Sequence, residues 1–201
     1  MSSLIYRYVP GHRPETLLLL HGTGGDETDL LGIGQAVLPG AGLLSPRGPV
    51  LENGMPRFFR RFGEGVFDEE DVKRRAAQLG DFLRDKAAEH EFDLTKVMAL
   101  GYSNGANIAA AMLLTGAATF SRAVLVRAMV PLEPETLPDL AGTEALLASG
   151  IYDPIATPEQ TRQLGTLLRK AGAKVTEHQQ TGGHEMTRGD IQAAGRWLGR
   201  E

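Results

Sequence analysis

Apolar residues in this chain gather in short continuous runs, a pattern typical of strands that are covered on both faces of a parallel sheet. The clearest run covers residues 17–20, which are all leucine. Other apolar residues recur at helical spacing, as Val72, Ala76 and Leu79 do in a helix of about six turns that we expect Asp68 to open. The predicted strands are residues 6–9, 16–20, 42–45, 97–100, 123–126, 144–149 and 174–178, and the other predicted helices are residues 27–37, 106–114, 158–171 and 187–198.

The order of these segments predicts the fold class. Strand and helix alternate about five times with short connections, which favours an α/β fold with a mostly parallel, doubly wound sheet and helices on both faces. Residues 46–68 are the exception, a long irregular stretch rich in Gly, Pro and Arg. Loops of that length are usually functional or mobile. No repeat, linker or low-complexity segment interrupts the pattern, so we expect residues 1–201 to form a single domain.

Composition narrows the classes of function. Hydrophobic content of 42% and charged content of 23% are typical of a soluble globular protein. The net charge is -4 and the basic residues form no dense block, which argues against nucleic acid as a partner. The absence of cysteine excludes disulfides, thiolate catalysis and Cys-ligated metals. The first residues form no apolar signal core and no apolar run is long enough to span a membrane, so we expect a cytoplasmic protein.

Residues 101–105, Gly-Tyr-Ser-Asn-Gly, lie between a predicted strand and a predicted helix. A strand, a tight turn and a buried helix form the context of a nucleophile elbow. Ser103 would occupy the tip of the turn in a strained conformation, and Gly101 and Gly105 would let strand and helix pack closely. The N–H groups at the start of the helix would face any negative charge beside Ser103. The alternative interpretation is a plain structural corner.

An activated serine needs a base to remove its proton and an acid to orient that base. Asp153 follows the next-to-last predicted strand, and His184 lies between the last strand and the last helix. In a doubly wound sheet, functional groups collect on the loops beyond the carboxyl ends of the strands. We therefore predict a catalytic triad of Ser103, Asp153 and His184. Asp153 as a simple turn initiator and His184 as a loop or cap residue are the alternatives, and Asp139 and Glu177 are competing acids.

The glycine-rich turn at residues 21–26 supplies the remaining component. Ester attack creates an oxyanion, which preorganised backbone N–H groups stabilise. We predict Thr23 and Asn104 as the two oxyanion donors, and we expect His21 to support its loop. A dinucleotide loop would need glycine at position 27, which is Glu27. No H-E-x-x-H motif or ligand cluster is present, so we predict no metal and no cofactor.

Together these residues resemble the phospholipase/carboxylesterase family of the α/β-hydrolase fold. The matching segments are residues 17–27, 58–62, 64–71, 101–107, 129–132, 150–154 and 183–184. The resemblance implies the same triad and the same oxyanion donors. The Thr-Gly-Gly-Asp sequence at residues 23–26 and the Arg-rich residues 58–62 look closer to the hydroquinone-associated esterase branch than to the acyl-protein thioesterases. Family members are often dimers, so a homodimer is a candidate assembly.

Chain length constrains the substrate pocket. Only about 17 residues separate the strand ending at Val126 from the next strand, too few for a helical cap domain. We therefore expect a minimal α/β-hydrolase core with an open cleft suited to short-chain or aromatic esters. The candidates for its apolar wall are Phe59, Phe62, Tyr102, Met129 and Ile151.

The sequence supports three functions. The first is a serine carboxylesterase that acts on a small-molecule ester through an acyl-enzyme. The second is a thioesterase, acyl-protein thioesterase-like enzyme, lysophospholipase or acyltransferase with the same triad. The third is a non-catalytic protein that binds a small carbonyl compound. The complete triad favours an enzyme and, among enzymes, the carboxylesterase.

Overall fold

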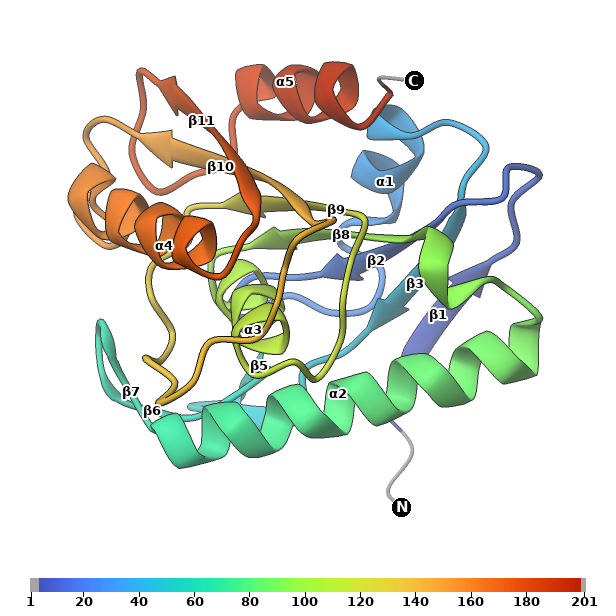
Figure 1. The fold of residues 1–201 in the computed structure, drawn as a ribbon, viewed down its shortest axis with the longest axis horizontal. Helices are drawn as coiled ribbons and strands as arrows, with labels where there is room; N and C mark the ends of the chain where they lie inside the picture. The colour runs from blue at the N-terminus through green and yellow to red at the C-terminus, as the bar shows by residue number, and fades with distance from the viewer. Residues whose placement is uncertain (1–3, 200–201) are drawn as a thin grey trace.

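A computed structural model describes residues 4–199. Its centre is a seven-stranded sheet in the order β1-β3-β2-β8-β9-β10-β11 (Figure 1). Strand β1 runs antiparallel to β3, and all other neighbours in this sheet are parallel. The strands are β1 (Tyr6–Val9), β2 (Thr16–Leu20), β3 (Gly42–Pro46), β8 (Val97–Tyr102), β9 (Arg122–Val126), β10 (Glu144–Gly150) and β11 (Lys174–Gln180). The helices are α1 (Leu31–Val37), α2 (Glu69–His90), α3 (Asn104–Leu114), α4 (Pro158–Lys170) and α5 (Arg188–Leu198), with a short 3-10 turn at Leu94–Lys96.

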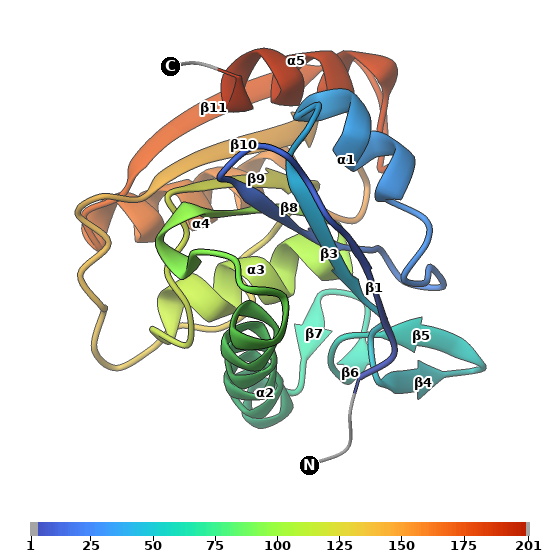
Figure 2. The ribbon, with the colours of Figure 1, turned by 90° about the vertical axis from the view of Figure 1, so that its right-hand side faces the viewer.

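Helices cover both faces of the sheet, as Figures 1 and 2 show. Helices α1 and α5 lie on one face, and α2, α3 and α4 lie on the other. Successive side chains of a strand point to opposite faces. In β2, Leu17 and Leu19 therefore pack in the cluster that contains Trp197 of α5, whereas Leu18 and Leu20 pack in the α3 cluster. The mostly parallel, doubly wound fold predicted from the sequence is confirmed.

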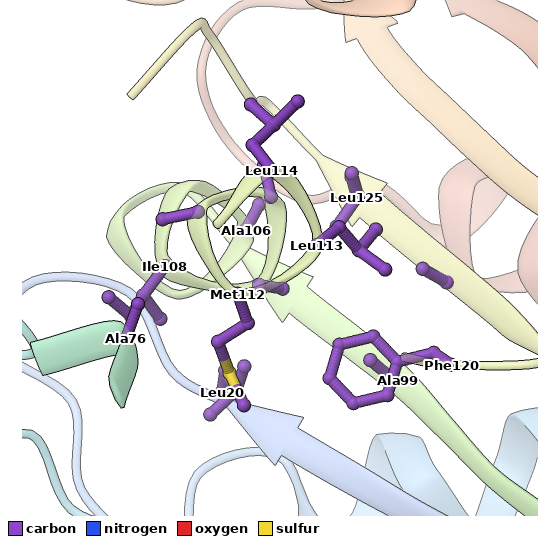
Figure 3. Close-up of a cluster of buried hydrophobic side chains, with 14 of the residues drawn as sticks. Leu20, Ala76, Ala99, Ala106, Ile108, Met112, Leu113, Leu114, Phe120 and Leu125 are labelled. Carbon is purple, nitrogen blue, oxygen red and sulfur yellow. The ribbon is translucent and has the colours of Figure 1, made fainter. Parts of the chain in front are cut away.

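Helix α3 lies inside the core and not on its surface (Figure 3). Every residue of the helix is buried. Met112 and Ile108 belong to the cluster that also holds Leu20 of β2 and Ala76 of α2. A helix enclosed on all sides needs no polar face, which explains its continuous apolar sequence. The element that follows Ser103 is thus fixed by packing from every direction.

Four predicted element boundaries need correction. The predicted helix at residues 27–37 begins only at Leu31. Asp26 Oδ1 accepts hydrogen bonds from the backbone N–H and the hydroxyl of Thr28, which holds the preceding residues in a turn. Strands β8, β10 and β11 each extend two residues or less beyond the predicted ends, to Tyr102, Gly150 and Gln180.

Residues 46–68, expected to be irregular, contain two small hairpins. Strand β4 (Val50–Glu52) pairs with β5 (Met55–Arg57), and β6 (Arg61–Gly63) pairs with β7 (Val66–Phe67). Strands of two or three residues are too short to show an alternating pattern, so the sequence did not reveal them. The predicted start of the long helix is confirmed, because the Asp68 carboxylate caps α2 by accepting from the Asp71 N–H.

No helix lies between β9 and β10, where residues 127–143 form an irregular connection. The fold therefore has the minimal core expected from the sequence at this point. Within residues 4–199, none of the helices combines the length and the apolar character needed to cross a membrane.

Candidate active site

Ser103 occupies a strained turn between β8 and α3. Its φ of 51° and ψ of -114° lie outside the regions that L-residues favour. The Ser103 N–H donates to the carbonyl of Val126 at 2.8 Å, and the Ser103 carbonyl accepts from the Asn107 N–H at 2.9 Å. These bonds hold the strained residue from both the neighbouring strand and the following helix.

The glycines on either side of the turn are required by close packing. A Cβ atom at Gly101 would lie 2.6 Å from the carbonyl oxygen of Gly105. A Cβ atom at Gly105 would overlap the carbonyl oxygen of Leu20 in β2. Both positions therefore exclude side chains because backbone atoms occupy the space. This is the geometry of a nucleophile elbow.

The structure brings Ser103, Asp153 and His184 together in one chain of hydrogen bonds. Ser103 Oγ lies 2.8 Å from His184 Nε2. His184 Nδ1 lies 2.9 Å from Asp153 Oδ2 and 3.1 Å from Oδ1. When Nδ1–H donates to the carboxylate, Nε2 is left to accept from the serine hydroxyl. The three residues follow β8, β10 and β11, so parallel neighbouring strands deliver them to the same edge of the sheet.

Asp153 is buried and held by its own loop. Its Oδ1 accepts from the backbone N–H of Ile155 at 2.8 Å and of Ala156 at 3.0 Å. These bonds fix the carboxylate and compensate its removal from water. The alternative acids stay on the surface, since Asp139 is exposed and Glu177 pairs with Arg169.

The loop that carries His184 is fastened by Arg127, a residue that the sequence analysis missed. Its fully buried guanidinium donates to the carbonyls of Gly183 and Glu185, which flank the histidine. It also forms a two-point ion pair with Asp190 of α5, at 2.8 and 3.2 Å. The one available signal was a single arginine that directly follows the apolar β9 run.

The candidate oxyanion residues lie at the same pocket. Asn104 is the first residue of α3, and N–H groups in the first turn of a helix have no partner within the helix. Thr23 lines the pocket, and its hydroxyl accepts from Arg57 Nη1 at 2.6 Å. The Asn104 side chain has a separate task, because its Oδ1 accepts from the Phe58 N–H at 2.7 Å.

His21 supports the glycine-rich loop and does not reach the serine. Its Nε2 accepts from the Gly48 N–H at 2.9 Å, and its Nδ1 lies 2.6 Å from the carbonyl of Gly22. Burial lowers the pKa of His21 because the charged imidazolium is costly away from water. The ring is therefore neutral, and it joins the loop after β2 to the segment after β3.

The pocket beside Ser103 has a volume of about 330 Å³. Of the residues proposed for its apolar wall, Tyr102 and Met129 line it. Phe59 does not, because it is fully buried and packs edge-on against Phe67. Phe62 and Ile151 are exposed and also lie outside it. The lining residues are Thr23, Arg57, Arg61, Glu64, Gly65, Phe67, Tyr102, Ser103, Asn104, Asn107, Arg127, Met129, Ile155 and His184.

Two features of this lining were not predicted. Residues 46–68, which form the two small hairpins and are called the hairpin segment below, contribute several residues to the lining. Three of the lining side chains are arginines. Within the part of the chain that the structure describes, no three His, Asp or Glu side chains are grouped as metal ligands would be. The pocket is thus a small, polar and mainly cationic cavity next to a hydrogen-bonded Ser–His–Asp set.

Several known hydrolases are similar to this chain over nearly its whole length. No protein-family model matches the chain. The protein named "Putative hydrolase MhqD" from Bacillus subtilis (strain 168) is 46% identical over 190 residues, which cover 94% of this chain and 95% of that protein. A carboxylesterase from Bacillus cereus shows 44% identity and a TM-score of 0.94, with 98% of this chain and 93% of that chain covered. A carboxylesterase from Mesorhizobium loti shows 30% identity and a TM-score of 0.89, with 98% and 94% covered.

The doubly wound sheet and the serine turn after β8 define an α/β-hydrolase, and similarity to carboxylesterases over nearly their whole length makes it a carboxylic ester hydrolase. The chain belongs to the phospholipase/carboxylesterase family, and its relative MhqD fits the hydroquinone-associated branch. Both conclusions confirm the resemblance inferred from the sequence.

Proposed function

We propose that this enzyme is a serine carboxylesterase that uses Ser103 as nucleophile, His184 as general base and Asp153 as the residue that orients the base. The observation that carries the proposal is the continuous hydrogen-bond chain from Ser103 Oγ through His184 to the buried Asp153 carboxylate. A serine hydroxyl becomes a nucleophile only when a base within hydrogen-bond distance can take its proton.

The first half of the reaction forms an acyl-enzyme. His184 Nε2 takes the hydroxyl proton while Ser103 Oγ attacks the ester carbonyl. The N–H groups of Thr23 and Asn104 stabilise the oxyanion of the tetrahedral intermediate. His184 then gives the proton to the leaving alkoxide or phenoxide, and the carbon–oxygen bond of the ester breaks. Asp153 stabilises the imidazolium during this exchange without taking the proton.

The second half releases the acid. Water enters the pocket, His184 removes one of its protons, and the hydroxide oxygen attacks the acyl-enzyme carbonyl. Collapse of the second tetrahedral intermediate returns the proton to Ser103 and frees the carboxylic acid. The small pocket of about 330 Å³ and the missing cap domain favour short-chain or aromatic esters over long acyl chains. A lysophospholipase function is less compatible with that volume.

The test is release of p-nitrophenol from acetate, butyrate and octanoate esters by the wild type and by Ser103→Ala. We expect the short esters to be preferred and the variant to lose at least about 10⁴-fold in kcat. Ser121→Ala is the matched control, because Ser121 directly precedes β9 and so lies at the amino-terminal end of the parallel strands, away from Ser103. A variant rate equal to the wild-type rate would reduce the elbow to a structural turn.

A matched thioester separates the alternative activity. Higher kcat/KM for the S-phenyl ester of butyrate than for its O-phenyl ester, after correction for their uncatalysed rates, would favour a thioesterase. Binding of the phenyl ester without any product would favour the non-catalytic protein.

A further inference from the structure

Two arginines on the hairpin segment reach the pocket that holds Ser103 and His184. Arg57 ends β5 and Arg61 begins β6, and both side chains line the cavity. The side chain of Arg57 is only 3% exposed, and that of Arg61 is 27% exposed. No step of the proposed ester chemistry uses the charge of either guanidinium, so the presence of two cations at this pocket needs a separate explanation.

These two charges are incompletely compensated. In the part of the chain described here, Glu52 is the one carboxylate within 4.0 Å of either group, at 3.6 Å from Arg57 Nη1 and 2.9 Å from Arg61 Nη2. One negative charge therefore serves two guanidinium groups. Arg127 provides the contrast, since it lines the same pocket but has its own buried partner in Asp190.

Both arginines also keep N–H groups that donate no hydrogen bond within the described part of the chain. Arg57 donates from Nε to the carbonyl of Phe59 and from Nη1 to the hydroxyl of Thr23. Arg61 donates from Nε to Glu52, and its Nη2 forms the ion pair with the same carboxylate. Among residues 4–199, Arg57 Nη2 and Arg61 Nη1 have no hydrogen-bond partner. Guanidinium N–H groups bind carboxylates through strong charge-assisted hydrogen bonds.

The local electrostatics agree with this geometry. Burial lowers the pKa of Arg57 to about 10, and the neighbouring charge of Arg61 acts in the same direction. An arginine with that pKa keeps its charge at neutral pH but lacks stabilisation, which an anion would supply. The one acidic lining residue outside the triad, Glu64, is exposed near the tip of the β6–β7 hairpin, where water screens its charge.

We propose that Arg57 and Arg61 form an anion subsite, and that the preferred substrate is an ester that carries a second, ionised carboxylate. This inference rests on the proposed esterase function and names its substrate class. The carboxylate can belong to the acyl part or to the alcohol part of the ester, and the test distinguishes these two sources.

The experiment uses two matched pairs of esters. Para-acetoxybenzoate and its methyl ester carry or lack a carboxylate in the alcohol part, whereas phenyl hydrogen adipate and phenyl methyl adipate carry or lack it in the acyl part. We expect the wild type to favour the acidic member of one pair by at least about tenfold in kcat/KM. A factor of about ten corresponds to the free energy of one hydrogen bond to a charged group. The pair that shows the preference locates the carboxylate.

The variants are Arg61→Gln, Arg61→Lys and the control Arg60→Gln. Arg61 is chosen because Arg57 also binds Thr23, and replacing Arg57 would disturb the glycine-rich loop at residues 21–26 that holds this oxyanion donor. We expect Arg61→Gln to remove most of the preference and Arg61→Lys to keep part of it. Arg60 is 58% exposed, pairs with Asp68 and lies outside the pocket, so Arg60→Gln should keep the wild-type preference.

Several outcomes would overturn the proposal. Equal kcat/KM for both members of both pairs would exclude an anion subsite, and an equal effect of Arg61→Gln and Arg60→Gln would assign the preference to overall charge. If the wild type hydrolyses no ester at all, the esterase function fails instead. Calorimetric titration of Ser103→Ala with each substrate then tests the subsite alone, because tighter binding of the acidic member needs no turnover.

Discussion

Ser103 and Arg61 line one pocket from two regions that are built in opposite ways. The first region, β8 and α3, is buried almost throughout, and the backbone at Gly105 leaves no room for a side chain. The second region, residues 46–68, consists of two short hairpins and exposes large apolar side chains such as Leu51 and Phe62. The proposed chemistry therefore rests on closely packed core, whereas the proposed selectivity rests on hairpins whose outer positions are exposed.

The largest effect should come from the triad. Asp153→Asn would place an amide beside His184 Nδ1 and favour the tautomer in which Nε2 carries the proton and cannot accept from Ser103. We expect kcat for p-nitrophenyl butyrate to fall by about 10⁴-fold while the protein stays folded. Asp139→Asn, on the exposed loop before β10, is the control. A loss smaller than about tenfold would contradict the proposed role of Asp153.

The next effect concerns the arginine that fastens the histidine loop. Arg127→Met leaves Asp190 buried without its partner, which should lower the free energy of unfolding by about 3–5 kcal/mol. Urea denaturation measures this change. Adding Asp190→Asn should restore part of the loss, because the uncompensated charge is then gone while the side-chain oxygen can still accept from the Thr187 N–H. Unchanged stability in Arg127→Met would show that the ion pair contributes nothing to the core.

A pair of glycine variants tests the contrast between the two regions directly. Gly105→Ala forces a Cβ atom onto the carbonyl of Leu20 and should cost about 2–3 kcal/mol of stability. Gly63→Ala adds the same methyl group to the β6–β7 hairpin, where no atom lies within 4 Å. There the change should stay within about 0.5 kcal/mol. Similar losses for both variants in thermal unfolding would remove the distinction.

The smallest effect is a pH dependence at His21, which joins the glycine-rich loop after β2 to residues 46–68. The pKa of His21 is lowered by burial from 6.5, so the unfolded chain takes up the proton first as the pH falls below that value. Stability should therefore decrease between pH 6.5 and the lower folded pKa, by up to about 1.4 kcal/mol per pH unit. His21→Gln should flatten this slope in urea titrations, whereas the surface variant His12→Gln should keep it.

The sequence was most informative where local pattern and topology act together. Ser103, Asp153 and His184 each follow a predicted strand, and parallel neighbouring strands place such residues at one edge of the sheet. The fold class could be predicted for the same reason, because apolar runs and helical spacing extend along most of the chain.

The parts that could not be predicted depend on long-range contacts or on very short elements. Arg127 and Asp190 form an ion pair although they are 63 positions apart in the sequence, and no local pattern predicts this pairing. Phe59 and Phe62 look alike in sequence, yet one is fully buried and the other is 77% exposed. Whether each side chain is buried or exposed depends on the turns of two hairpins whose strands are only two or three residues long.

The hairpin segment also has an evolutionary consequence. Its exposed positions Leu51, Met55, Phe62 and Val66 have few packing partners, so substitutions there cost little stability and accumulate easily. The same segment carries Arg57 and Arg61 to the cavity wall, while Phe58 and Phe59 anchor it in the core. Exchange of residues 46–68 between related hydrolases would therefore change the proposed anion subsite as a unit. The reaction machinery would stay in place as long as the incoming segment keeps the hydrogen bonds to Thr23 and Asn104.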